Sequence, residues 1–217
     1  PCEHSFPTRR SSDLILKQYG REYELDHGCL VPLYFVKNKY KLFKLVHITY
    51  GGLTPIELYK FGKLIGEAVH ESNKSVVFIA SGDLSHHLKD EGNYEYNAYG
   101  EKFDKNIIRL LKNGDVASIF NMDTEMIQKA GECGLRSYYI MLGSMDGHDI
   151  VGELLSYEGT FGVGYAVMKF KLKKSDREIL SEITKEKEKE YKERLKNEDV
   201  YVRRSEEHTS ELQSPIR

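Results

Sequence analysis

Residues 76–86 read Val76-Val77-Phe78-Ile79-Ala80-Ser81-Gly82-Asp83-Leu84-Ser85-His86, and this stretch decides the predicted fold. Five apolar, partly β-branched residues predict a buried strand, and the glycine with short polar residues predicts the turn that ends it. His86 is therefore expected at the carboxyl edge of a strand, where open α/β sheets bind ligands. Asp83 could orient the imidazole through one nitrogen while the other does chemistry. Alternatively, Asp83 caps a turn and His86 is a solvated loop residue.

Three other segments also predict strands, at residues 30–36, 45–50 and 164–170. A helix is expected after residue 53, because Thr54, Pro55 and Glu57 form a capping box with proline at the first helical position. This helix joins two predicted strands, so part of the sheet should be parallel. Further helices are expected at 103–111 and 133–145. The predicted fold is α/β, with a mixed, partly parallel sheet flanked by helices in a single-domain fragment.

The composition restricts the partners of the chain. A length of 217 residues with 40% hydrophobic content suits one α/β domain. A formal net charge of -2 gives no reason to expect nucleic acid. The sequence has no apolar run near the length of a membrane span and no signal-peptide centre in its first residues. Cys29 and Cys133 form no CxxC pattern, which favours a reducing cytoplasm over a disulfide framework.

Both ends of the chain look foreign to the domain. Residues 4–14 and 204–214 resemble translated sequencing adapters, and the second stretch can be back-translated codon by codon into an adapter string. We therefore set aside residues 1–14 and 204–217, including Cys2, when predicting the fold.

The order of several motifs points to a family. Asp26-His27-Gly28 precedes an apolar segment, and residues 130–137, 141–147 and 156–167 follow residues 81–86 in a characteristic order. Together they resemble the class III extradiol ring-cleavage dioxygenases, of the B-subunit type. The resemblance is strongest to the dioxygenase-like, Memo-related domain of AmmeMemoRadiSam system proteins. It covers about residues 22–170, which implies a domain at 15–172.

The residues after this domain change in character. Residues 173–198 are rich in Glu and Lys, which predicts a solvated linker helix with i,i+4 ion pairs. Residues 199–203 resemble the start of a protein A domain, so the natural protein is expected to continue beyond them.

The resemblance implies iron chemistry. Family members hold Fe(II) with two histidines and one carboxylate, leaving positions open for a catecholate and dioxygen. In the family, the two metal histidines come from the N-terminal part of the domain, ahead of the Asp-His-Gly segment. We expect this chain to be truncated before that point, and therefore to have an incomplete Fe(II) site and to be inactive as it stands. His86 matches the family's active-site histidine, and an ordinary imidazole pKa of about 6.5 suits proton exchange near neutrality. His27 matches a pocket histidine, or else ties Asp26 to the adjoining turn.

Two residues compete for the role of remaining metal ligand. Glu132 precedes a predicted helix in the half of the domain where the family supplies its carboxylate, while in the Memo branch a cysteine stands at the position of Cys133. Glu132 could instead cap that helix, which would contribute about 0.3–1 kcal/mol. Arg136 could hold an anionic substrate group or form a surface ion pair.

Two functions therefore remain open. The first is a dioxygenase acting on a small aromatic substrate and dioxygen; the second is a Memo-type metal, redox or binding module working beside a radical SAM protein. Both predict a cytoplasmic protein without nucleic acid or membrane partners.

Overall fold

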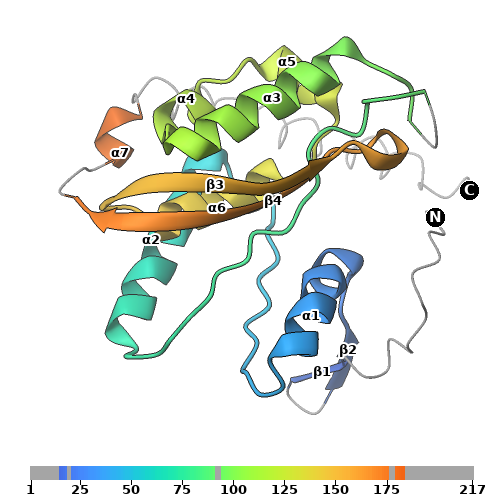
Figure 1. The fold of residues 1–217 in the computed structure, drawn as a ribbon. Helices are drawn as coiled ribbons and strands as arrows, with labels where there is room; N and C mark the ends of the chain where they lie inside the picture. The colour runs from blue at the N-terminus through green and yellow to red at the C-terminus, as the bar shows by residue number, and fades with distance from the viewer. Residues whose placement is uncertain (1–14, 19–20, 91–93, 176–178, 184–217) are drawn as a thin grey trace, which may run out of the picture. The chain divides into compact units, whose positions relative to one another are not determined.

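The computed structural model describes residues 15–18, 21–90, 94–175 and 179–183 (Figure 1). The chain forms two compact units, residues 1–49 and residues 50–217. Helices and strands are combined in one chain, so the α/β class is confirmed.

The described residues of the first unit form a hairpin and one helix. Strands β1 (Ile15–Gln18) and β2 (Arg21–Glu24) pair antiparallel, and α1 spans His27–Lys39. The strand predicted at residues 30–36 is wrong, because these residues lie inside α1. A short apolar run suits either element, and here the Asp26 carboxylate caps the helix by accepting from the Cys29 N–H at 2.8 Å.

The second unit contains the remaining elements. Its helices are α2 (Pro55–Glu71), α3 (Ala98–Asn113), α4 (Val116–Phe120), α5 (Thr124–Ala130), α6 (Leu135–Ser144) and α7 (Ile179–Glu182). Strands β3 (His148–Glu158) and β4 (Tyr165–Lys174) are joined through a short 3-10 turn, Thr160–Gly162. The capping box predicted for α2 is confirmed, since Thr54 and Glu57 cap each other's backbone N–H groups.

Helices α2 and α6 pack closely because glycines line their contact (Figure 1). A Cβ atom on Gly62 would lie 2.0 Å from the Ile140 carbonyl oxygen, and one on Gly143 would lie 2.0 Å from the Tyr59 carbonyl oxygen. Larger residues would separate the two backbones. This contact fixes α6, whose N-terminal end reaches the candidate site.

The β3–β4 hairpin packs against α3 (Figure 1). The two strands are antiparallel, with a bulge between Leu154 and Ser156. Ile150 belongs to the buried core, and Met168 and Phe170 pack against it. One face of the hairpin thereby covers α3, which carries the apolar stripe described below.

The predicted parallel sheet does not form among the described residues. Residues 45–50 and 76–80 are assigned to no strand, and both strand pairs are antiparallel. A strand needs a hydrogen-bonding partner, and none of the described strands pairs with residues 76–80. Val77 is 85% exposed, so this apolar run is not buried on both faces, although Phe78 and Ala80 pack against the core.

The ends of the predicted linker are only partly described. β4 continues through Lys174, so the strand includes the first residues predicted as linker, and α7 lies within the charged region. Residues 184–203 and both stretches interpreted as foreign lie outside the described residues. None of the described helices has the length and apolar character required to cross a membrane.

Candidate functional site

Two loops of the second unit meet at the candidate site. One is the loop after residue 80, which carries Asp83 and His86, and the other precedes α6 and carries Cys133. The loops approach closely at two glycines: a Cβ atom on Gly82 would lie 2.3 Å from the Cα atom of Gly134. The Asp83 backbone N–H donates to the Cys133 sulfur at 3.2 Å. Gly82 therefore allows residues 50 positions apart to share one site.

The start of α6 anchors the first loop. The Ser137 hydroxyl donates to the Ser81 carbonyl at 2.8 Å, and the Tyr138 hydroxyl donates to the Gly82 carbonyl at 2.8 Å. Burial raises the pKa of Tyr138, so its hydroxyl stays protonated as a donor. The loop is therefore attached to a helix that is itself fixed by α2.

Asp83, His86 and Cys133 bring three potential ligand atoms together. These atoms lie within 4.8 Å of one another, and the distance from His86 Nε2 to Asp83 Oδ2 is 3.5 Å. His86 Nε2 is buried and completes no hydrogen bond with any described residue, because the Asp83 oxygen is within ion-pair range but lacks hydrogen-bond geometry. A buried nitrogen that completes no hydrogen bond, and is partnered only by a nearby charge, is a candidate position for receiving a proton or a ligand.

The surroundings of His86 favour its charged form. The neighbouring Asp83 and Cys133 groups raise the pKa of His86 to about 9, outweighing the opposing effect of burial. The sequence suggested an ordinary imidazole near neutrality. A pKa of about 9 favours the imidazolium form at neutral pH, in which His86 can donate a proton. Its ring also lies against Tyr94, with ring centroids 5.0 Å apart.

Glu132 lies beside the cluster but has another partner. Its carboxylate accepts from the Leu135 N–H at 2.7 Å and so caps the start of α6. Burial raises the pKa of Glu132 despite this hydrogen bond. Among the described residues the group capable of holding a metal comprises Asp83, His86 and Cys133, without Glu132. A ligand role for Glu132 stays a prediction.

The other predicted site residues lie elsewhere. His27 begins α1 in the first unit and is exposed, and Asp26, besides capping that helix, lies 3.8 Å from His47. A crevice shared by His27 and His86 stays a prediction, because the two residues belong to different units. The guanidinium of Arg136 donates to the Gly51 and Leu53 carbonyls, and its role toward an anionic substrate group stays a prediction.

The three-residue cluster fits a divalent metal ion. Two ligands bound tetrahedrally at about 2.1 Å are about 3.4 Å apart, which is close to the 3.5 Å between His86 and Asp83. A thiolate, an imidazole and a carboxylate suit zinc, copper or iron rather than magnesium or calcium. The cluster differs from the two-histidine set that the family resemblance implies, because it contains one histidine.

One acidic residue near the site was missed by the sequence analysis. Asp104 is fully buried in α3, and its Oδ1 accepts from the Ser85 N–H at 2.8 Å while its Oδ2 accepts from the Tyr157 hydroxyl at 2.7 Å. Burial raises the pKa of Asp104, while the two hydrogen bonds lower it. A signal was present in the sequence, because Asp104 falls on the apolar stripe of α3 with Phe103, Ile107 and Leu111.

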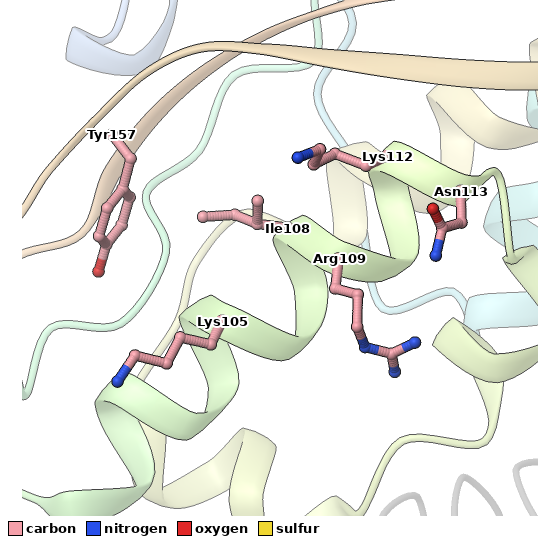
Figure 2. Close-up of a pocket in the computed structure, with 6 residues that line it drawn as sticks. All are labelled: Lys105, Ile108, Arg109, Lys112, Asn113 and Tyr157. Atoms are coloured by element: carbon pink, nitrogen blue, oxygen red, sulfur yellow. The ribbon is translucent and has the colours of Figure 1, made fainter.

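A separate groove lies beside α3 (Figure 2). It has a volume of about 450 Å³ and is lined by Lys105, Ile108, Arg109, Lys112, Asn113 and Tyr157. Its lining has no histidine, cysteine or carboxylate, so it lacks groups for metal binding or proton transfer at neutral pH. This groove therefore offers less for metal or acid-base chemistry than the cluster of Asp83, His86 and Cys133 does.

Comparison with known proteins identifies the family of the chain. The family described as "Catalytic LigB subunit of aromatic ring-opening dioxygenase" matches residues 10–168. "Protein CA_C1420" of Clostridium acetobutylicum is 48% identical over 197 residues, covering 91% of this chain and 42% of that protein. A "MEMO1 family protein" of Methanococcoides burtonii is 30% identical over 139 residues, covering 58% of this chain and 47% of that protein.

A named enzyme is also similar. "3,4-dihydroxyphenylacetate 2,3-dioxygenase" of Escherichia coli is 26% identical over 149 residues, covering 64% of this chain and 53% of that protein. The chain thus spans roughly half the length of these relatives, between 42% and 53%.

Proposed function

We propose that this chain, which belongs to the family of the catalytic LigB subunit of aromatic ring-opening dioxygenase, serves in Fe(II)-dependent extradiol cleavage of a catechol-type ring. The observation that carries the proposal is the buried His86 Nε2, which has no hydrogen-bond partner among the described residues and faces Asp83 and Cys133. The similar Escherichia coli protein, named as a dioxygenase of a dihydroxyphenyl compound, supports a catechol-type substrate.

His86 would move protons at Nε2. Asp83 Oδ2 lies 3.5 Å from that atom, so the carboxylate would stabilise the positively charged form of the ring. In a catechol complex, a neutral His86 would accept the proton of a substrate hydroxyl, and its imidazolium form would return a proton to a developing oxygen anion. Because the pKa of His86 is about 9, the ring already carries a proton at neutral pH. It could therefore donate this proton to the oxygen anion without first being protonated.

Cys133 would contribute one ligand to the metal, and Asp83 would remain the carboxylate partner of the His86 ring. When bound, ferrous iron would supply open coordination positions for a catecholate and for dioxygen. The two histidines that the family resemblance implies for the N-terminal part of the domain would complete a set of three ligands, with His86 left uncoordinated as the acid and base. A substrate contact by His27 stays part of the proposal.

A second function is supported by Cys133. A thiolate ligand favours thiophilic metals such as zinc and copper over ferrous iron. If Asp83, His86 and Cys133 all bind one ion, His86 is no longer free for proton transfer, and the site becomes a metal or redox centre. The similar "MEMO1 family protein" supports this alternative, in which a radical SAM protein would be the partner.

Oxygen uptake separates the two functions. The chain and a version extended by its natural upstream coding sequence are supplied with Fe(II) and a panel of catechols. We expect the extended version to consume dioxygen and to form a product whose mass equals that of the substrate plus both oxygen atoms. His86→Ala should lower turnover by about 10²–10⁴-fold, as expected for loss of a general acid and base.

His70→Ala is the matched control, because His70 is an exposed histidine in the last turn of α2. It should leave turnover unchanged. Full turnover in the His86→Ala protein would refute the role of His86. Tight metal binding through Cys133 without ring cleavage of any catechol would favour the second function.

A further inference from the structure

We infer that Asp104 is a positioning residue, which fixes the backbone at Ser85 and thereby directs His86 toward Asp83 and Cys133. The inference rests on the proposed function only for the use made of His86. The geometry that carries it belongs to the second unit alone.

Asp104 occupies a position where a charge requires partners. It is 0% exposed and lies among the buried Phe103, Ile107 and Leu84 of the core. An ionised carboxylate in such surroundings is strongly destabilising unless it is hydrogen-bonded. An apolar residue at this position would avoid the cost of burying a charge. The presence of a carboxylate is therefore explained by the hydrogen bonds that it accepts.

Both carboxylate oxygens of Asp104 accept hydrogen bonds. Oδ1 accepts from the Ser85 N–H at 2.8 Å, and Oδ2 accepts from the Tyr157 hydroxyl at 2.7 Å. Gly164 makes room for the carboxylate, because a Cβ atom at that position would lie 2.1 Å from Oδ2. The carboxylate therefore connects α3, the end of β3 and the loop that carries His86.

The loop is held at each residue around His86. The Ser85 hydroxyl donates to the Ala130 carbonyl at 2.9 Å and accepts from the His87 N–H at 2.9 Å. The His86 N–H donates to the same Ala130 carbonyl at 3.0 Å, and the Gly164 N–H donates to the Ser85 carbonyl at 2.7 Å. The Ser85 N–H, in contrast, donates to the carboxylate of a distant side chain. Its direction therefore depends on Asp104.

Loss of that acceptor would leave a buried N–H without a partner. The peptide between Leu84 and Ser85 would then turn to find another acceptor, and His86 follows directly. The ring contact between His86 and Tyr94, with centroids 5.0 Å apart, reports the direction of the His86 side chain. Asp104 thus acts on the site without touching substrate or metal.

Two substitutions of nearly equal shape test this role in the full chain. Asp104→Asn keeps an oxygen for the Ser85 N–H, and its amide can donate to the Tyr157 hydroxyl. Asp104→Leu removes both acceptors. The first readout, made without metal, is NMR: hydrogen exchange of the Ser85 amide and the nuclear Overhauser contact between the His86 and Tyr94 rings. The second is the Kd for Co(II), followed by thiolate-to-metal absorption from Cys133.

We expect the Leu variant to lose protection of the Ser85 amide and the His86–Tyr94 contact, and to bind Co(II) about 10–100-fold more weakly, the range found for groups that orient metal ligands. The Asn variant should stay within about threefold of the wild type in Kd, on the same principle. Amides in α2 should remain protected in both variants, which excludes general unfolding.

Wild-type exchange and ring contact in the Leu variant would overturn the inference, as would an Asn variant impaired as strongly as Leu. If the Leu variant fails to fold, Asn supplies the test alone, since it must preserve the ring contact. Absence of Co(II) binding by the wild type would refute the metal site of the proposed function, while the exchange and ring-contact readouts would still decide the role of Asp104.

Discussion

Removal of the Tyr157 hydroxyl should destabilise the second unit by a measurable amount. The substitution Tyr157→Phe keeps the ring but takes away the donor that lies 2.7 Å from the buried Asp104 Oδ2. A hydrogen bond to a charged group contributes about 1.5–3 kcal/mol. Tyr157 is 37% exposed, so we expect the lower part of that range, about 1.5–2 kcal/mol. For a domain of this size that corresponds to a fall in Tm of about 3–8 °C.

The loss should depend on pH. Burial raises the pKa of folded Asp104 above its ordinary value of 3.8, so the folded state binds a proton that the unfolded state has released, and stability falls as pH rises through that window. The Tyr157 hydrogen bond favours the carboxylate, so its removal raises the folded pKa further. The difference in Tm should therefore be complete at neutral pH and shrink as Asp104 becomes protonated on acidification.

Thermal unfolding followed by circular dichroism between pH 4 and 8 tests this reasoning. Tyr96→Phe is the matched control, because Tyr96 is 49% exposed, and its Tm should stay within about 2 °C of wild type. A Tyr157→Phe protein with the wild-type Tm at neutral pH would refute the hydrogen bond. A difference in Tm that grows on acidification would refute the ionisation of Asp104.

Three further predictions concern the candidate site. Gly82→Ala should lower the stability of the chain by about 1–3 kcal/mol in urea unfolding and weaken Co(II) binding, because the new methyl group meets Gly134; wild-type values would contradict the close approach. Asp83→Asn should move the NMR titration midpoint of His86 from about 9 toward its ordinary 6.5, and an unmoved midpoint would show that Asp83 is not the main cause. The chain as it stands should bind Fe(II) more weakly than Zn(II) in competition titrations, and Cys133→Ser should reduce this preference. Tight stoichiometric Fe(II) binding would contradict the expectation that this chain has too few ligands for an Fe(II) site.

Local signals in the sequence predicted α2, α3 and α6, but not α1, α4 and α5. Thr54, Pro55 and Glu57 form their capping box within one turn, so no distant partner is needed to recognise the start of α2. The strands were harder to predict. Residues 30–36 and 76–80 are apolar runs, and whether such a run becomes a helix, a strand or an unpaired segment depends on its tertiary partners. β3 was not predicted, because charged residues and Gly152 interrupt its apolar alternation.

Sequence spacing alone predicted only the part of the site whose residues are close in sequence, and Cys133 was named through the family resemblance. Asp83 and His86 stand three positions apart, so their proximity follows from the loop itself. The approach of Cys133 depends on contact between Gly82 and Gly134, which no local pattern reveals. Asp104 could have been recognised as a carboxylate on an apolar stripe, but its partners Ser85 and Tyr157 come from other segments of the chain.

The central claim is that Asp83, His86 and Cys133 form the reactive centre of this protein. Its most direct test is a crystal structure of the chain soaked with Co(II), with anomalous diffraction measured on both sides of the cobalt absorption edge. We predict one strong anomalous peak within bonding distance, about 2.3 Å, of the Cys133 sulfur and beside Asp83 and His86. Cobalt bound elsewhere while this cluster stays empty would contradict the claim.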